Sequence, residues 1–181
     1  DYPGFNLKIA EFAKKKGIKV FYYISPKVWA WNKSRIFKLK KFIDHLLVIF
    51  PFEVEFYKTY GLEVTYVGNP LLDEIAKQNY SFSFKSSKQI IALLPGSRKQ
   101  EIESILPEML KVVPSFPDYQ FVLAATNVFS KTYYQSFIKD KDVLCVYDKT
   151  YGLLSNARAA IVTSGTATLE AALFKVPQVV C

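Results

Sequence analysis

The chain has 181 residues, half of them hydrophobic, which is enough for one large core or two small ones. Its longest apolar runs, such as residues 46–52, are too short to cross a bilayer, and we expect no secretory leader. The two cysteines lack metal-ligand spacing, and the single histidine, His45, excludes His-rich metal sites and histidine-based triads. These features predict a cytoplasmic globular protein.

The net charge of +8 is concentrated near the start of the chain. Residues 1–50 carry eleven Lys and Arg against three acids, and the remainder is balanced. The densest part, residues 27–41 (KVWAWNKSRIFKLKK), combines Trp29, Trp31 and Phe37 with six cations and no acid. Such a surface suits nucleic acid, anionic lipid headgroups or a phosphorylated amphiphile, and the aromatic residues favour an interface. The alternative is a solvated basic helix whose aromatic side chains turn into the core.

The first half of the chain alternates between helical and extended patterns. We expect a helix capped by Asn6 and ending at Gly17, a strand over 18–24 and a basic helix over 33–42. A strand over 46–50, a helix over 52–60 closed by Gly61, a short strand over 63–67 and a turn at 68–70 follow. This alternation predicts an α/β fold with parallel strands and crossover helices.

Residues 78–88 (QNYSFSFKSSK) break the alternation, so we expect a linker there between domains at 1–77 and 89–181. Beyond it, strands are predicted at 89–95, 119–125, 142–147, 159–163 and 177–181, with a helix after each of the first four. Pro107 is expected to kink or split the first of these helices. Both halves are small for doubly wound domains, which predicts that both are truncated and that the chain is a fragment of a longer protein.

The stretch AIVTSGTATLEAA, residues 160–172, joins an apolar strand to a helix through a small polar turn. Ser164, Gly165 and Thr166 would leave backbone N–H groups unpaired at the positive end of the helix dipole, where a phosphate binds well. Glu170, one turn later, is placed to accept hydrogen bonds from ribose hydroxyls. The expected buried stripe of this helix consists of Leu169, Ala172, Leu173 and Val176. The alternative is an ordinary capped helix.

A second strand, turn and helix start occurs at ALLPGSRKQEIE, residues 92–103. Gly96, Ser97 and Arg98 would lie at the carboxyl edge of the same sheet as the first turn, where open α/β sheets bind ligands. The Arg98 guanidinium suits bidentate contact with a diphosphate, and the presence of a second such turn favours this role over the alternative of a surface arginine after a generic turn. The D-x-D sequence at 140–142 falls at the opposite edge, and we interpret it as a solvated turn.

Six segments in chain order, DYPGFN, SPKVWAW, PFEVEFY, YVGNPLLDEI, LLPGSRKQEIE and SGTATLEAAL, resemble the lipid-A-disaccharide synthases. The likeness extends over nearly the whole chain. The segments SPKVWAW and LLPGSR are the more specific ones, because related sugar transferases and a nucleotide-sugar epimerase have turns similar to SGTATLE.

The resemblance implies a GT-B architecture of two Rossmann-like domains. It implies the transfer of a sugar from UDP-2,3-diacylglucosamine to 2,3-diacylglucosamine 1-phosphate, with inversion and without a metal or cofactor. Asp1 matches the family's candidate general base for the acceptor 6-hydroxyl. Gly96, Ser97, Arg98, Ser164, Gly165 and Thr166 would hold the diphosphate, and Glu170 the ribose.

The resemblance also implies a more specific partner for the basic aromatic segment at 27–41. Trp29, Trp31, Lys33, Arg35 and Lys38 would contact the acylated acceptor or the inner leaflet of the inner membrane, with peripheral attachment and no nucleic acid partner. The full-length protein would be able to form a homodimer. The family's amino-terminal glycine-rich loop and carboxy-terminal segment fall outside this chain, so we expect it to be inactive alone. Asn69 stands where many members have histidine.

Two rival functions are also compatible with the sequence. A UDP-sugar epimerase of the same fold would share both phosphate turns but would need no acyl-binding surface and no second sugar. A non-catalytic nucleic-acid-binding module would use the basic residues between 8 and 41 and would bind in a salt-sensitive way.

Overall fold

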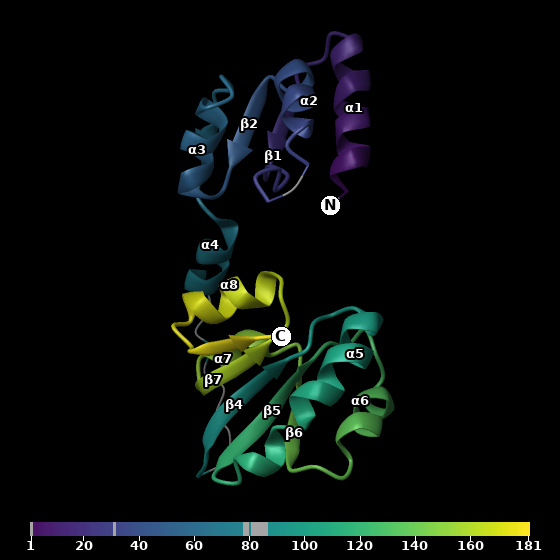
Figure 1. Ribbon diagram of the computed structural model, residues 1–181, viewed down its shortest axis with the longest axis vertical. Helices are drawn as coiled ribbons and strands as arrows, with labels where there is room; N and C mark the ends of the chain where they lie inside the picture. Colours follow the sequence, from purple (N-terminus) through teal and green to yellow (C-terminus); the bar gives the residue numbers. More distant parts are fainter. Residues whose placement is uncertain (1, 31, 78–79, 81–86) are drawn as a thin grey trace. The chain divides into compact units, whose positions relative to one another are not determined.

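The computed structural model describes residues 2–30, 32–77, 80 and 87–181, which separate into two compact units, Asp1–Asp73 and Glu74–Cys181 (Figure 1). Most of the predicted linker at 78–88 lies outside the described residues. The division between the units falls inside the helix α4 (Pro70–Lys77). Among the described residues, no helix combines the length and apolar character needed to cross a bilayer.

The first unit contains a three-stranded parallel sheet of order β1-β2-β3. Its strands are β1 (Phe21–Tyr23), β2 (His45–Val48) and β3 (Thr65–Tyr66), and its helices before α4 are α1 (Pro3–Lys15), α2 (Arg35–Phe42) and α3 (Pro51–Lys58). Its core is lined by Leu7 and Ala10 of α1, Ile36 and Leu39 of α2, and Tyr57 of α3, together with residues of β2. Three-residue spacing of apolar positions thus gives α2 its buried face.

The start of α1 differs from the prediction that Asn6 caps it. The helix begins at Pro3, because proline fits the first helical position, where no N–H bond is needed. Asn6 lies inside the helix, and its Nδ2 donates to the Tyr22 hydroxyl at 3.3 Å. The predicted end is confirmed, since Gly17 follows the helix with a φ of 74°.

The second unit contains a five-stranded parallel sheet of order β6-β5-β4-β7-β8. The strands are β4 (Gln89–Leu94), β5 (Tyr119–Ala125), β6 (Val143–Tyr147), β7 (Ala157–Val162) and β8 (Gln178–Val180). They are joined through α5 (Lys99–Leu110), the short 3-10 helix η1 (Val113–Ser115), α6 (Lys131–Ile138), α7 (Thr150–Leu154) and α8 (Thr166–Leu173). The predicted α/β fold with parallel strands is confirmed.

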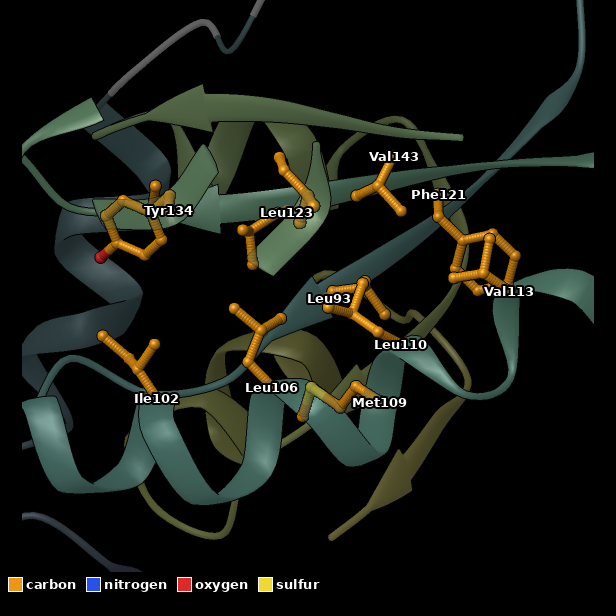
Figure 2. Packing of buried hydrophobic residues seen from close by; sticks show 12 residues of the cluster. Leu93, Ile102, Leu106, Met109, Leu110, Val113, Phe121, Leu123, Tyr134 and Val143 are labelled. Atoms are coloured by element: carbon orange, nitrogen blue, oxygen red, sulfur yellow. The ribbon is translucent and has the colours of Figure 1, made fainter. Parts of the chain in front are cut away.

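Side chains that alternate along the central strands divide the core of this unit into two layers. Leu93 of β4 and Leu123 of β5 pack against α5 and α6, where Figure 2 shows Leu106 and Tyr134 among the cluster. Their neighbours Ala92 and Val122 belong to the cluster made with α7 and α8 on the other face. The helix α5 continues across Pro107 to Leu110, so the proline does not split it.

Candidate functional site

The two predicted anion-binding turns lie side by side in the second unit. Leu94 at the end of β4 pairs with Val162 at the end of β7, and the Thr163 N–H donates to the Leu94 carbonyl at 2.9 Å. Both chains then turn at the carboxyl edge of the sheet, into α5 and α8 respectively. The parallel register therefore places the turn at 96–98 and the turn at 164–166 at the same edge of the sheet, on neighbouring strands, with Gly96 close to Thr163.

Gly96 is required by its surroundings. Its φ is 97°, in the left-handed region that glycine tolerates best. A Cβ atom placed there would lie 3.1 Å from Cγ2 of Thr163, and it would collide with the Glu101 carboxylate. The first turn thus packs closely on the residue that precedes the second turn.

The amino terminus of α8 is open. Its cap residue, Gly165, has no side chain to bond the first N–H groups, and a Cβ atom at this position would meet no atom within 4 Å. Ser164, Gly165 and Thr166 are exposed, but the expectation that Ser164 leaves its N–H unpaired is wrong, because this group donates to the Cys181 carbonyl at 3.3 Å. These features leave the positive end of the helix accessible to an anion.

Arg98 has an intramolecular partner that the sequence did not reveal. Its Nη1 donates to Oε1 of Glu101 at 2.8 Å, and its backbone N–H donates to Oε2 of the same carboxylate at 3.3 Å. Burial alone would raise the pKa of Glu101. The hydrogen bonds from the Arg98 backbone and guanidinium have the larger combined effect, so the pKa of Glu101 lies below its ordinary value. Arg98 is 82% exposed, so its guanidinium remains within reach of solvent and ligands. An acidic residue three positions after the helix cap was the available signal for this contact.

Glu170 lies in the second turn of α8 and is half-buried. The Tyr151 hydroxyl of α7 donates to its Oε1 at 3.4 Å. Burial raises the pKa of Glu170, and this hydrogen bond lowers it in part. Burial and the neighbouring carboxylate also raise the pKa of Tyr151 to about 12, so Tyr151 remains a donor at neutral pH. Tyr151, which no sequence motif indicated, is thus a second polar side chain beside the Glu170 carboxylate.

The predicted buried stripe of α8 is wrong in part. Val176, beyond the helix, is buried, but within α8 the fully buried residue is Ala171, whereas Ala172 is exposed and Leu169 and Leu173 are half-buried. Ala167, four residues before Ala171, and Phe174, three residues after it, pack against the same hydrophobic cluster. Apolar residues occupy nearly every side of this helix, so the periodicity does not select one face.

The D-x-D sequence at 140–142 forms a turn before β6, at the amino edge of the sheet, and Lys88 Nζ lies 3.5 Å from Oδ2 of Asp142. Within residues 2–30, 32–77, 80 and 87–181, no group of three or more metal-ligating side chains is gathered that could hold a metal ion.

The predicted basic aromatic residues belong to the first unit. Lys33 and Lys38 are exposed, Arg35 and Trp29 are half-buried, and Phe37 is 72% exposed. Phe37 therefore does not turn into the core, in contrast to Ile36 and Leu39 of the same helix. Asp1, the expected general base, and Trp31 lie outside the described residues.

Asn69 precedes α4, and its Oδ1 accepts a hydrogen bond from the Leu71 N–H at 3.0 Å. The side chain therefore satisfies one of the free N–H groups at the start of that helix. Asn69 is well suited to this structural role.

Comparisons with known proteins identify close relatives. The family model described as lipid-A-disaccharide synthetase matches residues 1–181. Lipid-A-disaccharide synthases from Syntrophus aciditrophicus and Coxiella burnetii are each 42% identical to this chain over 193 residues, and that from Trichlorobacter lovleyi is 38% identical over 192. These alignments cover 99% of this chain and 50% of each relative. The chain thus spans about half the length of the curated relatives it matches.

Among solved structures, a UDP-GlcNAc 2-epimerase from Methanocaldococcus jannaschii matches with a TM-score of 0.60 and 17% identity. The match covers 96% of this chain and 57% of that chain. At this identity the likeness concerns the fold alone, and it agrees with the predicted GT-B class of Rossmann-like α/β units.

Proposed function

The chain belongs to the lipid-A-disaccharide synthetase family, and we propose that, within a full-length enzyme, it helps to make the lipid A disaccharide. The proposed donor is UDP-2,3-diacylglucosamine and the proposed acceptor is 2,3-diacylglucosamine 1-phosphate. The products are the β-1,6-linked disaccharide 1-phosphate and UDP.

One observation carries the nucleotide-binding part of this proposal. The paired ends of β4 and β7 gather two turns, the open start of α8 and the Arg98 guanidinium at one sheet edge of one unit. Backbone N–H groups and a guanidinium together suit a diphosphate, and Glu170 on the same helix offers acceptors for ribose hydroxyls. Negative charge that develops on departing UDP would be stabilised by the same donors, without a metal ion.

In the proposed reaction, the acceptor 6-hydroxyl oxygen bonds to C1 of the donor sugar as the C1–O bond to the diphosphate breaks. The electron pair leaves with UDP, and the hydroxyl proton passes to the Asp1 carboxylate. Attack opposite to the leaving group inverts the anomeric carbon. Replacing Asp1 by Asn in the full-length enzyme should reduce turnover and leave UDP affinity nearly unchanged.

The surface of the first unit supports a lipid-facing role. Phe37 and Lys38 are exposed on α2, and the exposed Lys33 lies just before this helix. Trp29 lies on the loop that precedes them. Cations beside an exposed aromatic side chain favour an anionic, acylated surface. We therefore place this surface against the inner leaflet of the inner membrane, with peripheral attachment. Homodimer formation by the full-length protein stays a prediction from the family resemblance.

Thermal unfolding with and without UDP tests the nucleotide site. Saturating UDP should stabilise the chain, by about 2.7 kcal/mol at a hundred times Kd, and Arg98→Ala should abolish most of this effect. Lys111→Ala, which removes an exposed cation paired with Glu108 at the other end of α5, should leave it intact. Stabilisation by RNA without a response to UDP would instead support a nucleic-acid-binding module.

A further inference from the structure

The loop that follows β1 is held in a strained conformation. Ile24, directly after the strand, has a φ of 62°, and its N–H donates to the Leu47 carbonyl of β2 at 3.1 Å. A β-branched residue in this region is a genuine outlier, which persists only when its surroundings fix it. The loop from Ile24 to Trp29 leaves the carboxyl edge of its sheet, where α/β folds bind ligands.

Tyr57 of α3 fixes the start of this loop. Its side chain is fully buried, and its hydroxyl hydrogen-bonds the Ser25 hydroxyl and donates to the Pro26 carbonyl at 3.3 Å. Ser25 is itself buried, and its Oγ lies 3.1 Å from the Pro26 carbonyl oxygen, so its single proton goes either to that oxygen or to the Tyr57 hydroxyl. A buried polar group without a partner is costly, so these three groups depend on one another.

Glu53, one turn earlier on α3, fixes the end of the loop. Its side chain is only 1% exposed, and Oε1 accepts a hydrogen bond from Nε1 of Trp29 at 3.3 Å. Oε2 accepts the backbone N–H groups of Ile49 and Phe50, at 3.3 and 3.1 Å. Helix capping accounts for the second oxygen, whereas the first ties α3 to the indole.

The Trp29 ring also packs against α3. It meets Phe52 edge to face, with 5.1 Å between the ring centres. The indole is thus oriented by a carboxylate at its nitrogen and by an aromatic side chain, both from the same helix. The neighbouring Lys27 and Ala30 are exposed.

We propose that Glu53 and Tyr57 are positioning residues that hold the Ser25–Trp29 loop so that Trp29 and Lys27 meet an acylated anionic lipid. The proposal rests on the proposed function, which supplies two sources of that chemistry, the acylated sugar phosphate and the bilayer. It adds that the contact depends on a buried network in α3 and not on the surface charges alone.

The indole N–H of Trp29 gives a direct readout. The chain has two tryptophans, so Trp31→Phe assigns the two indole signals in a nitrogen-15 spectrum. Glu53→Gln should move the Trp29 signal and raise its hydrogen-exchange rate at least about tenfold, because the buried acceptor is altered. Glu55→Gln, on the exposed side of the same helix, is the matched control and should change neither.

Tyr57→Phe keeps the ring packing and removes only the hydroxyl, which guards against simple unfolding of the Glu53 variant. Lipid binding is measured for the same proteins with anionic phospholipid vesicles and, separately, with monomeric short-chain diacylglucosamine 1-phosphate. The vesicle arm reports a bilayer contact, and the monomer arm reports a substrate contact. Both α3 variants should weaken at least one of these interactions several-fold, while Glu55→Gln should not.

The outcomes separate this proposal from the proposed function. An unchanged Trp29 signal and exchange rate in Glu53→Gln overturns the positioning role. An altered signal with undiminished lipid binding in both α3 variants overturns the link between the loop and lipid. If the unmodified chain binds neither lipid although the indole responds, it is the lipid-facing part of the proposed function that fails.

Discussion

The guanidinium of Arg98 lies 2.8 Å from the carboxylate of Glu101, at the amino terminus of α5. The carboxylate occupies the positions that an anionic ligand would take at both the helix terminus and the arginine. At the proposed diphosphate site, Glu101 would compete with the ligand for these hydrogen-bond donors.

Glu101→Gln should therefore strengthen UDP binding. Glutamine can still cap α5, so the change removes charge with little loss of stability. In this variant UDP no longer has to break the exposed Arg98–Glu101 ion pair, which is worth about 1 kcal/mol. The expected gain in UDP affinity is roughly fivefold and can be measured by calorimetry. Glu103→Gln, whose carboxylate lies 3.8 Å from Lys99 on the same helix, serves as the control. Weaker UDP binding by the Glu101 variant would show that the carboxylate supports the site.

Glu170→Gln should reduce the discrimination between UDP and 2′-deoxy-UDP, because the neutral amide oxygen is a weaker acceptor than the carboxylate. A carboxylate that accepts a hydrogen bond from the ribose 2′-hydroxyl favours UDP by about tenfold. The exposed Glu108→Gln should preserve that preference. Equal binding of both nucleotides by the unmodified chain would remove Glu170 from the ribose site.

The same variant should change the pH dependence of stability. The pKa of Glu170 is raised above its ordinary value of 4.5, so the folded chain holds this proton more tightly than the unfolded chain. Its contribution is therefore complete at low pH and is lost as the pH rises from 4.5 through the raised pKa. The Glu170→Gln variant should not show this loss of stability with rising pH, as measured by thermal unfolding. The same pH profile of stability in the variant and the unmodified chain would contradict this role of Glu170.

Gly96→Ala should impair both stability and UDP binding. The positive φ and the approach of Thr163 leave no room for a Cβ atom, which should cost roughly 1–3 kcal/mol. Gly61→Ala shares the backbone strain, but its Cβ would meet only the flexible end of Lys40. Denaturant unfolding should therefore show a loss in both variants, and UDP titration a loss only in Gly96→Ala. Normal UDP affinity in Gly96→Ala would separate this turn from the nucleotide.

Replacing Lys33, Arg35 and Lys38 together by Gln should release the protein from anionic vesicles. Each cation near an anionic surface contributes about 1 kcal/mol to binding, so the loss of three cations should weaken vesicle binding roughly a hundredfold at low salt. Flotation measures this directly. The control replaces Lys131, Lys139 and Lys141 of the other unit, which removes the same charge. Undiminished flotation of the first variant would exclude this surface as the attachment site.

The architecture of the sheet edge was predictable from local patterns. Apolar runs followed by PGSR and SGT predicted two strands that end in turns, and the rules for parallel sheets placed both turns at the carboxyl edge. The structure confirms that the two turns adjoin each other. Their ligand remains a prediction.

Contacts between distant residues were not predictable in the same way. Glu53 bonds Trp29, and Tyr151 bonds Glu170, across separations that no local periodicity encodes. The buried face of α8 was missed because apolar residues surround that helix, and small Ala171 packs in place of the larger leucines. The helix α1 starts at Pro3 and not at Asn6, because proline at the first helical position sets the start and a polar side chain alone does not identify the cap.

The proposed transfer reaction can be tested by identifying its products. An enzyme of full family length is incubated with UDP-2,3-diacylglucosamine and 2,3-diacylglucosamine 1-phosphate, and the products are identified by mass spectrometry and proton NMR. The proposed reaction should give equimolar UDP and a β-1,6-linked disaccharide 1-phosphate, with both sugars consumed. Conversion of the donor to its epimer, with the acceptor untouched, would contradict it.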